Sequence, residues 1–206
     1  MALLIFLVTP IIATLLSCCV RARRAYLEAI AAIAASIELA AAAILLRDVS
    51  SGSVPAFTEY FSLDALGMIV LLPVAIIGCA AAFYSIGYLR EEMRKEIVGF
   101  HRIREYFILF HVFIAAMGIA VSASNPIVMW IAVEATTLST VFLISIYNKP
   151  SSVEAAWKYL LINSIGLLLG FFGTLLFFTS LSEQTSFIHW RELLAGASAL
   201  NPFVAR

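Results

Sequence analysis

Glu134 is an ionisable residue inside an otherwise apolar stretch, MWIAVEATTLSTVFLIS. At 1.5 Å per helical residue its carboxyl group would lie roughly 10 Å inside a bilayer core about 30 Å thick. An ionisable group at that depth costs a few kcal/mol to insert, which makes it a candidate for function. The hydroxyls of Thr136, Thr137, Ser139 and Thr140 follow it and could hold the carboxyl group or water in place. The pattern predicts reversible protonation of Glu134; a structural carboxyl group bonded to a neighbouring helix is the alternative.

Lys158 is a basic residue about one turn inside the next apolar stretch, so it is the natural counterpart of Glu134. A positive charge that approaches a carboxyl group favours its ionised form, and one that recedes lets the group take up a proton. We expect Glu134 and Lys158 to act together in proton transfer. The alternative is a lysine that extends to the membrane surface and pairs with Glu154, four residues earlier.

Glu38 and His111 are two further ionisable residues in apolar stretches, and both are candidates for a proton relay. Alanines occupy the positions one and two turns from Glu38, and small residues mark a helix face that packs against other helices. His111 shares a stripe with Ala115, Gly118 and Ser122, and a histidine can relay protons through its two ring nitrogens. For each residue the alternative is a structural role, paired with a neighbouring helix.

Three glycines, Gly166, Gly170 and Gly173, follow Lys158 in the same apolar stretch. The G-x-x-x-G spacing lets another helix approach closely, so it predicts a helix-packing face.

These residues belong to a chain of 206 residues that is 63% hydrophobic and 13% charged. A soluble domain has about 25% charged and 45–50% apolar residues, so the composition excludes a cytosolic enzyme, a nucleic-acid binder and a disordered chain. The 13 basic and 13 acidic residues balance, and net charge indicates no partner. Since a membrane-spanning helix needs about 20 apolar residues, we predict an all-α integral membrane protein with six spans: roughly 2–20, 27–46, 63–88, 106–124, 127–147 and 155–180.

The basic residues are distributed unevenly between the predicted linkers. Ten of the 13 fall after the first, third and fifth spans or just inside the sixth. Because cytoplasmic loops are enriched in lysine and arginine, these linkers should face the cytoplasm, which leaves both termini outside. The first span has its arginines after it rather than before it, unlike a signal peptide.

The linkers themselves are polar. We expect 47–62 to be an outer loop and Pro150 to end the fifth helix. For 89–105 we expect mainly a solvated charged loop; a short interfacial helix over part of it is the alternative. The tail 181–206 contains no further span. The chain also has no glycine-rich nucleotide loop and no cysteine–histidine cluster, so we expect no cofactor, no metal site and no catalytic residues of its own.

Two segments carry a resemblance to a known family: NPIVMWIAVEATTLSTVFLI and EAAWKYLLINSIGLLLGFFGTLLF. They resemble the proton-translocating antiporter-type subunits of complex I, Mrp antiporters and membrane-bound hydrogenases. The run VEATTLST is most similar to the hydrogenase 4 component F branch, and the upstream FSLDALGMIV also fits. The resemblance covers about 60–200, with Glu134 and Lys158 at the positions of the family's glutamate and lysine.

This resemblance implies a fourteen-helix fold of which the chain is the first part. Its domains would be a three-helix segment with its cytoplasmic loop (1–105), the first three helices of a proton-translocation repeat (106–180), and an outer tail (181–206) ending before the family's next helix. That next helix carries the family's central partner lysine, which has no position here. The chain is therefore expected to be truncated, partial or split.

The resemblance also implies a function. We expect a proton-translocating subunit in a prokaryotic plasma membrane, without a redox site of its own. Its partners would be other membrane subunits and, through the complex, soluble iron–sulfur, hydrogenase or dehydrogenase subunits; no nucleic acid is involved. Two alternatives are a sodium/proton antiporter subunit of the Mrp type and a non-transporting structural membrane protein.

Overall fold

Six long helices and one short hairpin make up the described part of the chain. The computed structural model describes residues 1–21, 23–52, 54, 56–147, 149–179 and 190. All six helices are long and apolar enough to cross a membrane. The elements in chain order are α1 (Ala2–Cys19), α2 (Arg24–Ser50), β1 (Ala56–Thr58), β2 (Phe61–Ser62), α3 (Ala65–Arg94), α4 (Phe100–Ser122), α5 (Pro126–Ile144), a 3₁₀ turn (Ser145–Tyr147) and α6 (Pro150–Thr179).

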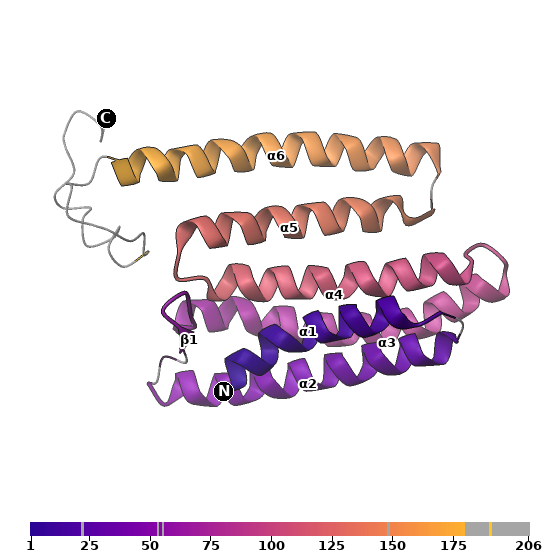
Figure 1. Ribbon diagram of the computed structural model, residues 1–206, viewed down its shortest axis with the longest axis horizontal. Helices are drawn as coiled ribbons and strands as arrows, with labels where there is room; N and C mark the ends of the chain where they lie inside the picture. Colours follow the sequence, from indigo (N-terminus) through magenta and orange to yellow (C-terminus); the bar gives the residue numbers. More distant parts are fainter. Residues whose placement is uncertain (22, 53, 55, 148, 180–189, 191–206) are drawn as a thin grey trace.

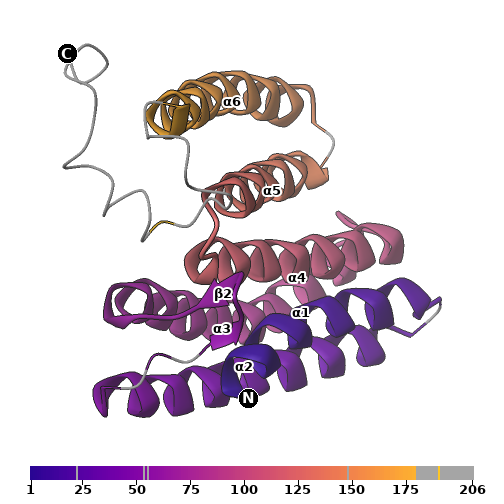
Figure 2. The ribbon, with the colours of Figure 1, turned by 60° about the vertical axis from the view of Figure 1, so that its left-hand side comes forward.

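Helices α1 to α4 form a bundle around a continuous apolar interior (Figures 1 and 2). Near the hairpin end, Phe6 of α1 and Leu45 of α2 pack in one cluster with Leu71 of α3. At the opposite end, Leu27 of α2 packs in one cluster with Phe107 of α4. Because the buried positions on each helix recur every three or four residues, each helix presents one continuous face to this interior.

Helices α5 and α6 lie to one side of that bundle. Figures 1 and 2 show α5 beside α4, and α6 beyond α5 on its far side. Within the described residues Ala156 is the single buried residue of α6. The rest of the helix is covered on one face by α5 and is otherwise exposed.

The hairpin β1–β2 closes one end of the bundle. Its strands pair antiparallel, and Phe61 also pairs with Ala123 directly after α4. Ser124 donates its backbone N–H to the carbonyl of Tyr60 at 2.7 Å. The linker predicted as a loop therefore contains a small two-stranded sheet, anchored on the connection from α4 to α5.

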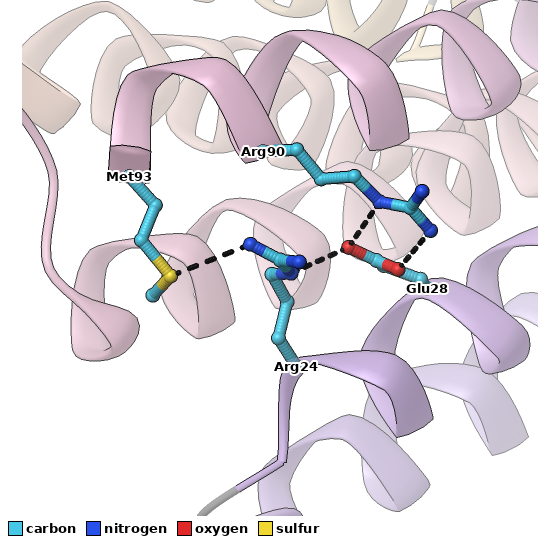
Figure 3. A network of polar contacts seen from close by, with 4 residues as sticks. All are labelled: Arg24, Glu28, Arg90 and Met93. Atoms are coloured by element: carbon cyan, nitrogen blue, oxygen red, sulfur yellow. Dashed lines mark hydrogen bonds and ion pairs between the residues drawn. The ribbon is translucent and has the colours of Figure 1, made fainter. Parts of the chain in front are cut away.

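An ion-pair cluster joins α2 to α3 at the opposite end (Figure 3). Arg90 binds both carboxylate oxygens of Glu28, with nitrogen–oxygen distances of 2.6 and 3.1 Å. Arg24, one turn before Glu28, binds the same carboxylate at 2.8 Å and reaches the sulfur of Met93. Glu28 is buried, so its charge depends on these two arginines.

Six apolar helices are confirmed, but two predicted boundaries are wrong. The charged segment 89–105 is mainly helical: α3 continues to Arg94 and α4 begins at Phe100. Ion pairs at helical spacing, such as Glu91 with Arg94, are compatible with helix beyond the apolar core. Pro150 begins α6 rather than ending α5. Proline is tolerated there because the N–H groups in the first turn of a helix have no acceptor within the helix, so the missing N–H group costs no hydrogen bond.

Asp64 stabilises the start of α3. Asp64 precedes it and accepts a hydrogen bond from the backbone N–H of Gly67 at 2.7 Å. This is the position at which a carboxylate stabilises a helix start. The tail 181–206 lies outside the described residues except for Trp190, and the domain boundaries remain a prediction.

Candidate functional site

Glu134 lies on the side of α5 that faces α6, and its partner comes from α6. Ser164 Oγ donates a hydrogen bond to Glu134 Oε1 at 2.9 Å. The second oxygen, Oε2, is buried and has no hydrogen-bond partner in the described part of the chain. One oxygen is thus held in place, while the other remains available for a water molecule, a proton or a further donor.

The four hydroxyls that follow Glu134 have a different role from the one predicted. Thr136 and Thr137 donate to the carbonyl of Val133, while Ser139 donates to that of Ala135. Thr140 donates to the carbonyl of Thr136. Donation to the previous turn of the same helix is common for serine and threonine in apolar helices, because no water competes for the hydroxyl group.

Sequence reasoning missed Ser164 as the partner of Glu134. The sequence does contain a hint, because Ser164 is a hydroxyl residue in the apolar run LLINSIGLLLG. Nothing in one sequence indicates which face of α6 packs on α5, however. The antiparallel pairing of the two helices is what brings positions 134 and 164 together.

A tryptophan fixes this pairing about one turn from Glu134. Trp130 donates its indole N–H to Thr174 Oγ1 at 3.0 Å. A Cβ atom added to Gly170 would lie 2.7 Å from Trp130 Cη2, so glycine is needed for the indole ring to approach α6 this closely. Gly170 therefore lies against a neighbouring side chain, whereas nothing in the described structure lies within 4 Å of a Cβ atom added to Gly166 or Gly173; the packing role of the three glycines stays a prediction.

Lys158 lies on α6 but does not share the position of Ser164. It binds Glu154 at 2.5 Å, and its side chain is 70% exposed. Six residues separate it from Ser164, which corresponds to about 9 Å along the helix and about 120° around it. The described structure therefore pairs Lys158 with Glu154 and Glu134 with Ser164, on different faces of α6.

The other two candidates lie in the bundle rather than between α5 and α6. Glu38 is 4% exposed and His111 is fully buried. Glu38 Oε1 and both ring nitrogens of His111 have no hydrogen-bond partner among the described residues. The structure thus groups the four predicted ionisable residues in two places: Glu134 and Lys158 on α5 and α6, Glu38 and His111 inside α1–α4.

Comparison with known proteins places α5 and α6 in a known family. Residues 123–201, which include Glu134, Lys158 and Ser164, match the family model described as NADH:quinone oxidoreductase/Mrp antiporter, transmembrane. A hydrogenase-4 component F homolog of Methylacidiphilum infernorum is 30% identical over 147 residues, which is 69% of this chain and 31% of that protein. NADH-quinone oxidoreductase subunit L of Mycobacterium tuberculosis is 31% identical over 124 residues, covering 58% of this chain and 18% of that protein.

Solved structures show the same fold. A chain of the membrane-bound sulfane sulfur reductase, an archaeal respiratory membrane complex, matches 98% of this chain with a TM-score of 0.72 and 17% identity. A chain of respiratory complex I from Thermus thermophilus matches 92% of it with a TM-score of 0.64 and 23% identity. These matches cover 40% and 38% of the solved chains, and the chain spans about a third of the hydrogenase-4 relative. Residues 123–201 thus match the transmembrane region of the NADH:quinone oxidoreductase/Mrp antiporter family, and the chain is similar in sequence to hydrogenase-4 component F and to NADH-quinone oxidoreductase subunits L and N.

Proposed function

We propose that this chain transfers protons across the membrane of a prokaryotic cell as one subunit of a multi-subunit redox complex, and that Glu134 is the group that binds the proton. The observation that carries the proposal is the half-satisfied carboxyl group: Ser164 holds Oε1, and Oε2 is buried without a partner in the described structure. A fixed carboxyl group with one free oxygen can accept a proton and release it without moving the helix.

Lys158 has a modulating role in this proposal rather than direct contact. Its ammonium group is held by Glu154 on the same helix, and about 9 Å of helix separates it from Ser164. Release of Lys158 from Glu154 would strengthen its attraction for the Glu134 carboxylate, and recapture by Glu154 would weaken it. Breaking or forming the Lys158–Glu154 ion pair at one end of α6 would thus change the proton affinity of Glu134 on α5.

The electron-transfer chemistry belongs to partner subunits in this proposal. Relatives of this chain are named as components of a hydrogenase and of NADH-quinone oxidoreductases. We infer that this chain contributes a proton path, and that the subunits with redox groups drive it through contacts within the membrane.

The test compares Glu134→Gln with Glu154→Gln in the assembled complex reconstituted in vesicles. Glu134→Gln should lower the number of protons taken up per substrate molecule oxidised, because an amide does not take up a proton in this pH range. Glu154→Gln removes an exposed carboxyl group from the neighbouring helix and should alter the rate without abolishing transport.

Three results would contradict the proposal. Coupled proton uptake that is undiminished in Glu134→Gln would show that the residue does not carry the proton. Uptake of labelled sodium in exchange for protons, without oxidation of any substrate, would favour an antiporter of the Mrp type. Normal assembly and transport after both Glu134 and Lys158 are replaced would favour a structural subunit.

A further inference from the structure

Glu38 and His111 are buried, ionisable and unused by the proposed path through Glu134. Glu38 is 4% exposed and His111 is 0% exposed, yet three of their polar atoms lack a partner within the described residues. Buried polar groups are nearly always hydrogen-bonded, so unpaired atoms of this kind indicate a ligand, a water molecule or a functional role.

Glu38 lies on the face of α2 that packs against α1, α3 and α4. Ala35, one turn earlier, is in one buried cluster with Phe110 and Ile114 of α4. Ala42, one turn later, is in one cluster with Phe6 of α1. The Glu38 carboxyl group therefore lies between a turn of α2 that packs on α4 and a turn that packs on α1.

His111 lies on the face of α4 that packs against the same two helices. Phe107, one turn earlier, is in one buried cluster with Leu27 and Ala31 of α2. Gly118, two turns later, faces Phe6 and Leu7 of α1. The imidazole ring thus points into the interior shared by α1, α2 and α4.

The two residues also lie at nearly the same depth. Ala35, three residues before Glu38, shares its cluster with Phe110, the neighbour of His111. This places Glu38 and His111 within about one helical turn of each other along the bundle axis, or about 5 Å. No hydrogen bond or ion pair joins the two side chains in the described structure, so a link between them at this offset would run through one or two water molecules.

Helix α1 adds further polar groups to this interior. Ser17 is fully buried, and its Oγ has no partner in the described structure. Pro10, also buried in α1, has no N–H group to donate to the carbonyl of Phe6, one turn earlier. Ser17 and Phe6 are eleven residues apart, about 16 Å along α1, so these two groups would bind separate water molecules, while the three unpaired atoms of Glu38 and His111 are the polar partners nearest the proposed link.

Charge balance determines what such an interior can hold. An unpaired carboxylate in an apolar interior costs several kcal/mol, and so does an unpaired imidazolium. A carboxyl group and an imidazole ring that share one proton carry no net charge in either of its positions. We propose that Glu38 and His111 form a second proton-binding site inside α1–α4, in which one proton is shared between the Glu38 carboxylate and the His111 imidazole through buried water.

Other titratable groups line the helices around this interior, and among them Arg104 has a buried Nε without a partner in the described structure. On α2, Glu28 is held by Arg24 and Arg90. On α3, Cys79 packs half-buried against the cluster that contains Ala35. On α4, Tyr106 bonds Ser85, and Arg104 reaches the carbonyl of Val20; on α5, Glu134 faces α6 and bonds Ser164. Helix α1 presents no acidic, basic or histidine side chain between Ala2 and Cys19.

The test follows the protonation of His111 in the 206-residue chain in lipid bilayers, by solid-state NMR with ¹⁵N-labelled histidine and ¹³C-labelled glutamate. The chain has three histidines, at 101, 111 and 189, which single variants assign. If the proton is shared, Glu38→Gln should change the proton affinity of His111 about tenfold or more. His101, which pairs with Glu105 at the start of α4, should keep its titration curve and is the internal control. Glu154→Gln removes an exposed carboxyl group and should leave His111 unchanged.

A titration curve of His111 that is the same with glutamate and with glutamine at position 38 overturns the proposal. If Glu38→Gln does not fold, the same spectra of the wild-type chain test the proposal. The Glu38 carboxyl signal and the His111 ring signals should then change over the same pH steps. Polarisation should also pass from water protons to the His111 nitrogens. The proposal is overturned if the two groups titrate independently. It is also overturned if no polarisation passes from water protons to the His111 nitrogens. None of these readouts depends on Glu134, so the proposed path through α5 can fail while this site stands.

Discussion

At the scale of single residues, the sequence points to the Glu134 carboxyl group as a candidate site, but it does not reveal the partner of that group. Glu134 could be predicted because a charge in an apolar stretch is costly and rare. Its partner Ser164 could not, since hydroxyl residues in apolar helices usually bond their own backbone, as Thr136 and Ser139 do here. Only the packing of α6 on α5 distinguishes the hydroxyl group that binds the carboxyl group from those that do not.

Ser164→Ala should slow coupled proton transfer by about tenfold in the assembled complex. The variant removes the hydrogen bond that holds Oε1 of Glu134, and a bond to a charged group contributes about 1.5–3 kcal/mol. Thr179→Ala is the matched control, because that hydroxyl group bonds only a carbonyl of its own helix in the described structure. Equal proton-transfer rates in the two variants would show that Ser164 has no role in proton transfer by Glu134.

At the scale of helices, the packing of α6 on α5, called the seam below, depends on one glycine of the three that were predicted to pack. The G-x-x-x-G spacing indicates a close approach, but Gly170 alone meets a neighbouring side chain in the described structure, and that neighbour is Trp130. The spacing could not show this, because the direction in which each glycine faces depends on the position of the partner helix.

Gly170→Ala should destabilise the seam by about 1–3 kcal/mol, because the added methyl group would meet the indole ring of Trp130 and displace it from Thr174. Gly166→Ala is the control, since nothing lies within 4 Å of the added atom and alanine favours a helix. Thermal unfolding in detergent, followed by tryptophan fluorescence, measures both variants. Equal unfolding temperatures would show that Gly170 and Trp130 do not pack closely.

The helix pair α2–α3 is held by the buried carboxylate of Glu28 between two arginines (Figure 3). Glu28→Gln should lower the unfolding temperature by a few degrees, because it removes three charged contacts and leaves both guanidinium groups without their shared partner. Glu91→Gln is the matched control, since Glu91 pairs with Arg94 and Lys95 of its own helix and is more exposed. A larger loss in Glu91→Gln would contradict this role of Glu28.

At the scale of the whole molecule, the six helices could be predicted, whereas the hairpin β1–β2 and the contacts between the helices could not. Six long apolar stretches specify six helices because the bilayer requires every backbone group to bond within its own segment. The helix ends beyond the bilayer follow local capping and ion pairing instead. This is why α3 and α4 extend into the charged segment 89–105, and why Pro150 begins α6.

The orientation of the whole chain is predicted from its basic residues, with the hairpin end outside and the Glu28 end in the cytoplasm. In a chain whose three cysteines are replaced by alanine, Ser51→Cys should react with a membrane-impermeant maleimide on intact cells. Lys95→Cys, in the connection from α3 to α4, should react only after the cells are permeabilised. The opposite labelling would invert the predicted topology.

The measurement that tests the central claim most directly is the number of protons transported per electron in vesicles containing the complex, with glutamate, aspartate or glutamine at position 134. A proton-binding carboxyl group predicts that Glu134→Gln lowers this ratio while the complex still assembles. Glu134→Asp should keep the ratio at a reduced rate, because the carboxyl group is retained on a shorter side chain. An unchanged ratio in an assembled and active Glu134→Gln complex would contradict the account.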